Sequence, residues 1–178
     1  MKHKDFILLT GGLLLLNEIL KPVDKKAIGA VQSDIDDLIR FTITSKSNVN
    51  KKATIETVGE EEAKQLKAIT EEDLFGFIHT VDAYSIKHIL KQHGNQAKEQ
   101  LRGQVAVTIN DFYLIPAIVK NADIITVSKT KLGLKAILYQ KQIGDTYYYI
   151  EEIRSGKKEL AATSLYKRKA AKKQPKKN

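Results

Sequence analysis

Two histidines spaced five residues apart are the clearest candidates for chemistry in this sequence. His88 and His93 lie in the segment 84–93, where apolar residues recur at helical spacing. Imidazole titrates near neutral pH, so either ring is suited to general acid or base catalysis. Five residues rotate an ideal helix by about 140° beyond one full turn, which directs the two rings to different sides. The spacing also differs from the i, i+4 pair of histidine metal sites, so we expect no metal site here.

The same spacing allows a structural interpretation of both histidines. His93 continues the apolar stripe formed by Ile86 and Ile89, which is typical of a hydrogen-bonded residue at the edge of a core. His88 falls on the polar side of the helix with Tyr84, where it would simply be solvated. The spacing alone leaves the catalytic and the structural interpretations open.

A second group of candidates lies in the strand predicted at residues 159–167. Alternation along this strand puts Ser164 and Tyr166 on one face and Thr163 and Lys167 on the other. Hydroxyl groups and cations can hold a phosphate oxyanion by hydrogen bonding and charge. The alternative is an ordinary strand with polar outward positions. The tyrosines at 147–149 are able to stack on bases, although alternation means that at least one of them packs inward.

Composition favours a polyanionic partner. The 178 residues carry a formal net charge of +9, which suits nucleic acid or an anionic membrane. Seven Lys and Arg residues and no acid lie in residues 167–178, so the basic character belongs largely to the tail. The chain has no cysteine, which excludes disulfides, thiolate zinc sites and cysteine nucleophiles. A hydrophobic content of 42% is sufficient for a folded core.

The first 70 residues predict an N-terminal helical docking region with a linker. The apolar run at 6–16 predicts an amphipathic helix that ends at Lys21-Pro22; a secretory signal or membrane anchor is the alternative, although no A-x-A cleavage site follows. The patterns predict a second helix at 28–41, a polar linker at 45–52 and a short acidic helix at 60–66.

Residues 71–167 predict a compact α+β domain, and residues 168–178 form a basic tail. We expect two to three helices packed on a mainly antiparallel sheet of about four strands. The expected helices are 82–92, capped by Asp82, then 96–102, and one from Asn110 or Asp111 to Val119. Short strands are expected at 75–79 and 105–109, and longer ones at 124–127, 134–141, 146–154 and 159–167, with turns at 144–145 and 155–156.

The order of these motifs resembles a family of nucleases. The segment 85–94 is similar to the KHxxxxHG helix of the phage-associated branch of the barnase/EndoU/colicin/RelE-like (BECR) nuclease superfamily. The later parts follow in the same order: Asp111-Phe112 through Ile115-Pro116, a strand containing Tyr139, a tyrosine-rich strand, and Thr163-x-x-Tyr166-Lys167. The resemblance covers residues 75–168 and leaves out the first 70 residues.

The resemblance implies a metal-independent endoribonuclease that needs no cofactor and is toxin-like or associated with a phage or virion. In such chemistry a base removes the 2′-OH proton, the oxygen attacks phosphorus, and an acid protonates the leaving 5′-oxygen. The product ends in a 2′,3′-cyclic phosphate. Carried over to this sequence, His88 is the first acid–base candidate and His93 the second. The rest of the catalytic set is Arg154, Thr163 and Tyr166. The expected nucleic-acid-binding residues are Lys87, Lys91, Lys141, Ser164, Lys167 and Arg168.

RNA is the expected partner, and an immunity protein or a phage structural protein is the further partner that the resemblance implies. The expected location is the cytoplasm or a virion, with secretion as the alternative suggested by the N-terminus. Two other functions remain open. One is a non-catalytic nucleic-acid-binding or virion-packaged protein that works through its tail. The other is a membrane-tethered interaction protein that uses residues 6–20.

Overall fold

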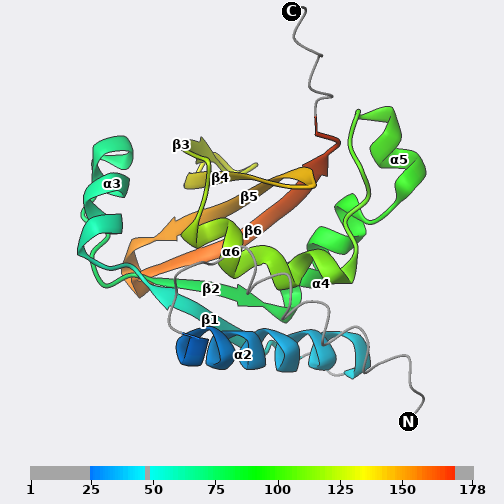
Figure 1. Ribbon diagram of the computed structural model, residues 1–178, viewed down its shortest axis with the longest axis horizontal. Helices are drawn as coiled ribbons and strands as arrows, with labels where there is room; N and C mark the ends of the chain where they lie inside the picture. Colours follow the sequence, from blue (N-terminus) through cyan, green and yellow to red (C-terminus); the bar gives the residue numbers. More distant parts are fainter. Residues whose placement is uncertain (1–24, 47–48, 171–178) are drawn as a thin grey trace, which may run out of the picture.

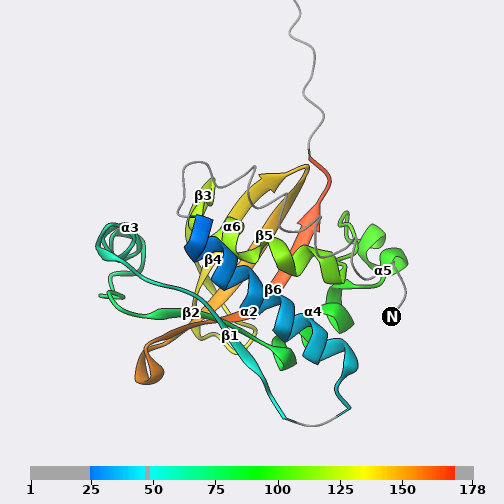
Figure 2. The same ribbon diagram turned by 60° about the horizontal axis from the view of Figure 1, so that its bottom comes forward.

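The fold is α+β and contains a six-stranded mixed sheet (Figures 1 and 2). The computed structural model describes residues 25–46 and 49–170. The elements in chain order are α2 (Lys25–Thr44), β1 (Lys52–Thr57), α3 (Glu60–Thr70), β2 (Ile78–Asp82), α4 (Ala83–His93), α5 (Gln96–Leu101), the 3₁₀ helix η1 (Ile109–Leu114), α6 (Ile115–Lys120), β3 (Ile124–Lys129), β4 (Lys135–Ile143), β5 (Asp145–Arg154), the 3₁₀ turn η2 (Ser155–Lys157) and β6 (Glu159–Arg168).

The sheet is larger than the sequence predicts and is not wholly antiparallel. Its strand order is β1-β2-β6-β5-β4-β3, and β2 pairs with β6 in parallel while the other neighbours are antiparallel. The four strands from β3 to β6 confirm the predicted antiparallel part. The expected linker ends where β1 begins, because Ala53 and Ile55 alternate with exposed residues and enter the core.

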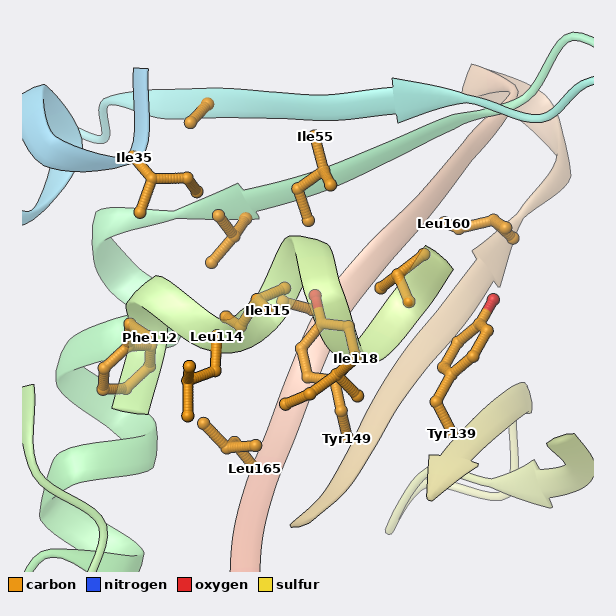
Figure 3. Packing of buried hydrophobic residues seen from close by; sticks show 14 of the residues in the cluster. Ile35, Ile55, Phe112, Leu114, Ile115, Ile118, Tyr139, Tyr149, Leu160 and Leu165 are labelled. Atoms are coloured by element: carbon orange, nitrogen blue, oxygen red, sulfur yellow. The ribbon is translucent and has the colours of Figure 1, made fainter. Parts of the chain in front are cut away.

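Helices cover one face of the sheet, which we call the helix face. Figure 3 shows the core there, with Ile115 and Ile118 of α6 packed against Tyr139, Tyr149 and residues of the neighbouring strands. The buried side chains of α2 (Ile35, Leu38 and Ile39) belong to the same core. Part of the predicted N-terminal region therefore folds together with the sheet, since its apolar stripe packs against β1, α4 and η1.

The opposite face of the sheet, which we call the open face, carries half-buried side chains. On β5 and β6 these are Tyr148, Ile150, Glu152, Ser164 and Tyr166. The register pairs Tyr148 with Tyr166 and Thr146 with Arg168, so these four residues lie side by side on adjacent strands. A bulge interrupts the register between Ile150 and Glu151, where Thr163 is the additional residue of β6.

Helix α4 packs beside β6 and confirms the predicted helix with its cap. Asp82 accepts a hydrogen bond from the Ser85 backbone N–H at 2.7 Å, which caps the first turn. The Ser85 hydroxyl donates to the carbonyl of Ala162 in β6 at 2.9 Å and so holds the helix beside that strand. At the other end, a Cβ on Gly94 would lie 2.4 Å from the carbonyl oxygen of Leu90, so only glycine fits there. The helix predicted at 96–102 is also present as α5, and it is capped by Asn95.

Three local predictions are wrong in their details. The strand expected at 75–79 begins instead at Ile78, because Gly76 adopts a φ of 74° and makes a turn. The strand expected at 105–109 is reduced to a single bridge between Val105 and Lys167. The following helix is split into η1 and α6, because Pro116 lacks an N–H group and is best accommodated in the first turn of a helix.

The predicted helix at 6–16, its signal or anchor alternative, and residues 171–178 of the tail lie outside the described residues. Of the helices that the structure describes, none has the length and apolar character needed to cross a membrane.

Candidate functional site

Four side chains form a continuous group on the open face near the end of β6, and we call them the ring cluster: His93, Tyr166, Tyr148 and Arg168. The rings of Tyr148 and Tyr166 stack with their centroids 4.8 Å apart and an interplanar angle of 3°. The Arg168 guanidinium lies over Tyr148, 5.6 Å from the ring centroid. His93, at the end of α4, packs on Tyr166, and the centroids of these two rings lie 5.9 Å apart. A cation, two phenols and an imidazole are thus gathered on one surface.

A buried carboxylate holds the imidazole of His93. Its Nδ1 lies 3.1 Å from Oε2 of Glu99, a residue of α5 whose side chain is fully buried. The other carboxylate oxygen of Glu99 accepts a hydrogen bond from Nη1 of Arg102 at 2.7 Å. The chain reverses between α4 and α5 at Gly94 and Asn95, and this turn brings Glu99 back against the end of α4.

This pairing determines which nitrogen of His93 is available for chemistry. A carboxylate accepts hydrogen bonds, so Nδ1 carries the proton and donates to Glu99. In the neutral ring Nε2 then holds the free lone pair, and it has no hydrogen-bond partner in the described part of the chain. The side chain of His93 is 18% exposed, so the ring is packed but reaches the surface. An imidazole oriented by a carboxylate in this way is able to take up or release a proton.

Tyr166 is held as a neutral phenol. Burial raises its pKa above the ordinary value, against an opposing effect of Arg168, and Tyr148 raises it slightly further. The hydroxyl therefore keeps its proton at neutral pH and can donate a hydrogen bond or a proton. The stack on Tyr148 fixes the ring, because the two residues face each other in the β5–β6 register.

His88 lies apart from this arrangement. Its side chain is exposed, and its ring stacks on that of Tyr84 one turn earlier, with centroids 6.5 Å apart and an interplanar angle of 15°. His93 by contrast is half-buried and joined to Glu99. The structure therefore separates the two histidines as the 140° rotation predicts, and it brings only His93 into the ring cluster.

The other predicted site residues are distributed over both faces. Thr163 sits at the bulge, and its hydroxyl donates to the carbonyl of Ile150 at 3.1 Å. Ser164 is half-buried on the open face. Arg154 lies at the end of β5, where its Nε donates to Glu152 at 3.0 Å. Lys87 and Lys91 are exposed on α4.

Two lysines that were predicted to bind phosphate form ion pairs with aspartates of this chain. Lys167 points to the helix face, where its Nζ lies 2.9 Å from the carboxylate of the buried Asp111. Asp111 also accepts a hydrogen bond from the Tyr147 hydroxyl at 2.7 Å. Lys141 is paired with Asp123 at 2.7 Å. Since Lys167 is largely enclosed and already neutralised, binding a phosphate would require breaking a buried pair. We therefore infer that Lys167 does not contact RNA.

A second buried network lies on the helix face. His79 is fully buried, with Nδ1 2.8 Å from Glu151 and Nε2 3.0 Å from Glu62 of α3. Burial alone lowers the pKa of His79, but the two carboxylates raise it to about 10, so the ring is an imidazolium. Glu151 also accepts from the Tyr149 hydroxyl at 3.1 Å. Among the described residues, no group of three or more His, Asp or Glu side chains is arranged to hold a metal ion.

Glu99 and Arg102 belong to the site but are not among the residues that the sequence predicts for it. Their i, i+3 spacing in the predicted helix at 96–102 indicates an ion pair within that helix. No spacing relates Glu99 to His93, because the two residues lie in different helices separated by a turn. The missing information was the angle at which the chain reverses.

Comparison with protein families identifies the family of this chain. The model of the phage-Barnase-EndoU-ColicinE5/D-RelE like nuclease3 family matches residues 56–175. The chain belongs to this nuclease family. The matched segment runs from β1 past the end of β6 and includes the entire ring cluster with Glu99 and Arg102. No curated protein and no solved structure matches the chain. The resemblance that the motifs at 85–94 and 163–167 indicate is therefore confirmed at the level of the family.

Proposed function

We propose that this nuclease is an endoribonuclease that cleaves RNA without a metal ion at the ring cluster. The observation that carries the proposal is the His93–Glu99 pair, which leaves Nε2 of His93 free beside the neutral phenol of Tyr166. Family membership supports the cleavage of a phosphodiester, and the residues of the cluster support the route. Arg168, exposed at its edge, supplies the positive charge that a phosphate needs.

In the proposed reaction Nε2 of His93 removes the proton of a ribose 2′-OH. The resulting oxygen attacks the adjacent phosphorus, and the bond from phosphorus to the 5′-oxygen breaks. Tyr166 donates its proton to that leaving oxygen, so the products are a 2′,3′-cyclic phosphate and a free 5′-hydroxyl. Arg168 stabilises the charge that builds up on the phosphate oxygens. Glu99 stabilises the imidazolium that forms, because its carboxylate accepts from Nδ1.

This assignment reverses the order of the two histidines that the sequence suggested. The family resemblance makes His88 the first candidate, yet its only ring contact in the described structure is Tyr84. His93 has both properties that an acid–base residue needs, an orienting carboxylate and an accessible second nitrogen. Thr163 and Arg154 have local partners, and in the proposal they shape the open face without reacting.

Incubation of the purified full-length chain with labelled RNA in excess chelator tests the proposal. We expect cleavage with 2′,3′-cyclic phosphate ends, and no cleavage of the same sequence made as 2′-O-methyl RNA, which lacks the nucleophilic hydroxyl. A strict requirement for added magnesium or zinc would contradict the metal-independent route. Tight binding without any cleavage would favour the alternative of a non-catalytic nucleic-acid-binding protein, which the basic tail alone could support.

The phage association in the family description supports a role in phage biology. A toxin-like role, a place in the virion, and an immunity protein or phage structural protein as partner all remain proposals. Co-purification from phage particles and from infected cells would distinguish a packaged protein from one that acts in the cytoplasm.

A further inference from the structure

We propose that the exposed side of α4 is a second binding site for single-stranded RNA, which holds nucleotides that flank the cleaved phosphate. We call this site the α4 platform and define it by Tyr84, Lys87, His88 and Lys91. The inference rests on the proposed function, because it names the path of the substrate away from the ring cluster. It assigns to His88 a role in binding and leaves the proton transfer to His93.

The aromatic part of the α4 platform is exposed but well ordered by its neighbours. Tyr84 is 70% exposed, and its ring stacks nearly parallel on His88. Its backbone N–H donates to Oδ1 of Asn50 at 3.1 Å, and Asn50 in turn donates to Asp82, the cap of the helix. The pair thus presents flat rings to the solvent from a fixed backbone. Flat rings of this kind stack on nucleic acid bases whatever their sequence.

The charge of the α4 platform suits a polyanion. Lys87 and Lys91 are exposed and form no ion pair with any described residue. Helix α4 contains no Asp or Glu, so no acid on the same helix offsets these two cations. Alternating rings and cations are the features by which proteins hold the bases and phosphates of a single strand. Base stacking also requires unpaired bases, so the platform favours a single strand over a duplex.

The position of α4 connects the platform to the ring cluster. Tyr84 lies in the first turn of the helix and His93 is its last residue, which corresponds to about 13 Å along the axis. Tyr84, His88 and Gln92 lie four residues apart and form one ridge of the helix, which leads toward the end that carries His93. Nine residues rotate the helix by about 900°, so Tyr84 lies on the opposite side of α4 from His93. A long single strand bound at Tyr166 therefore reaches this ridge by passing round the end of α4 at Gln92, whereas a dinucleotide bound at the ring cluster is too short to reach Tyr84.

The experiment compares substrates of two lengths with the full-length chain. One is a dinucleoside monophosphate, and the other is a single strand of about 12 nucleotides that contains the same cleaved step. We expect Tyr84→Ala to raise KM for the longer RNA by at least about 5-fold, with little change in kcat, since one stacked base is lost. Cleavage of the dinucleotide should not change. Tyr84→Phe should behave as the unmodified chain because it keeps the ring.

Phe75→Ala is the matched control, because Phe75 is also an exposed aromatic residue, 58% accessible, and it precedes the start of β2, whereas α4 follows the end of that strand. It should leave both substrates unaffected. Replacing Lys87 and Lys91 together with Ala should reduce the slope of log KM against log salt for the longer RNA by about 1.4. An equal effect of Tyr84→Ala on both substrates, or none on either, would overturn the inference.

A binding measurement separates the inference from the proposed function. Fluorescence anisotropy with 2′-O-methyl RNA of the longer length reports the α4 platform without any cleavage. We expect Kd to rise by at least about 5-fold for Tyr84→Ala and to stay constant for Phe75→Ala. If the chain cleaves no RNA but this difference in Kd is observed, the proposed function fails and the binding site stands. If Tyr84→Ala binds this RNA as tightly as the unmodified chain, the inference fails whatever the activity.

Discussion

Replacing His93 with Asn separates catalysis from folding at the ring cluster. The Asn side-chain amide reaches roughly the position of the imidazole Nδ1, so it can keep the donation to Glu99 that His93 makes at 3.1 Å. It has no counterpart of Nε2, the proposed base. We therefore expect the rate on a dinucleotide to fall by about 10²- to 10⁴-fold, or about 2.7 to 5.5 kcal/mol in the barrier, while the fold is retained.

His93→Ala should lose stability as well as activity. It leaves the fully buried carboxylate of Glu99 with Arg102 as its remaining partner. Losing a hydrogen bond to a charged group costs about 1.5 to 3 kcal/mol, which corresponds to a melting temperature lower by roughly 3 to 12 °C. The difference in melting temperature between the Ala and Asn variants thus measures what the bond to Glu99 contributes.

His88→Asn provides the comparison at the other histidine. His88 is exposed, so its replacement should change stability by no more than about 0.5 kcal/mol and leave kcat on the dinucleotide unchanged. The assays are a melting curve and steady-state cleavage of the dinucleotide for all three variants. A fully active His93→Asn together with an inactive, folded His88→Asn would refute the assignment and place the reaction outside the ring cluster.

Three further predictions concern the buried networks and the tail. The pKa of His79 is raised to about 10, so the folded chain keeps a proton that the unfolded chain releases above about pH 6.5. The contribution of His79 to the free energy of unfolding is therefore complete below about pH 6.5 and is lost as the pH rises toward 10. Urea midpoints should fall over this pH range, and they should fall less for His79→Gln. Equal slopes for the two proteins would argue against a protonated His79. Lys167→Met should destabilise the fold by about 3 kcal/mol in urea unfolding, because Asp111 keeps a buried charge without its cation. The salt dependence of RNA binding should not change. A shallower salt dependence would mean that Lys167 contacts RNA. Deleting residues 169–178 removes five cations and should lower the salt slope of RNA affinity by up to about 3.5 while cleavage at low salt persists; an unaltered slope would mean that the tail does not contact RNA.

Local patterns determined those parts of the protein whose partners are close in the chain. The strands β4, β5 and β6 follow one another through short turns, so alternation and turn residues such as Gly144, with a φ of 67°, were sufficient to predict them. Helix α4 was predictable from its apolar period and the Asp82 cap. The motifs carried by α4 and β6 were also sufficient to indicate the nuclease family.

Only the tertiary structure decided which distant segments meet. The parallel pairing of β2 with β6 and the addition of β1 join parts that no local pattern relates, because they are stabilised by burial summed over the entire core. The same holds for the site. The distinction between His88 and His93 depends on Glu99, whose position follows from the angle between α4 and α5. Lys167 looked like a phosphate ligand from its type, yet the strand pleat turns it toward Asp111, 56 residues away in the chain. A charged side chain shows its type in the sequence, but its partner, and therefore its role, is determined by the fold.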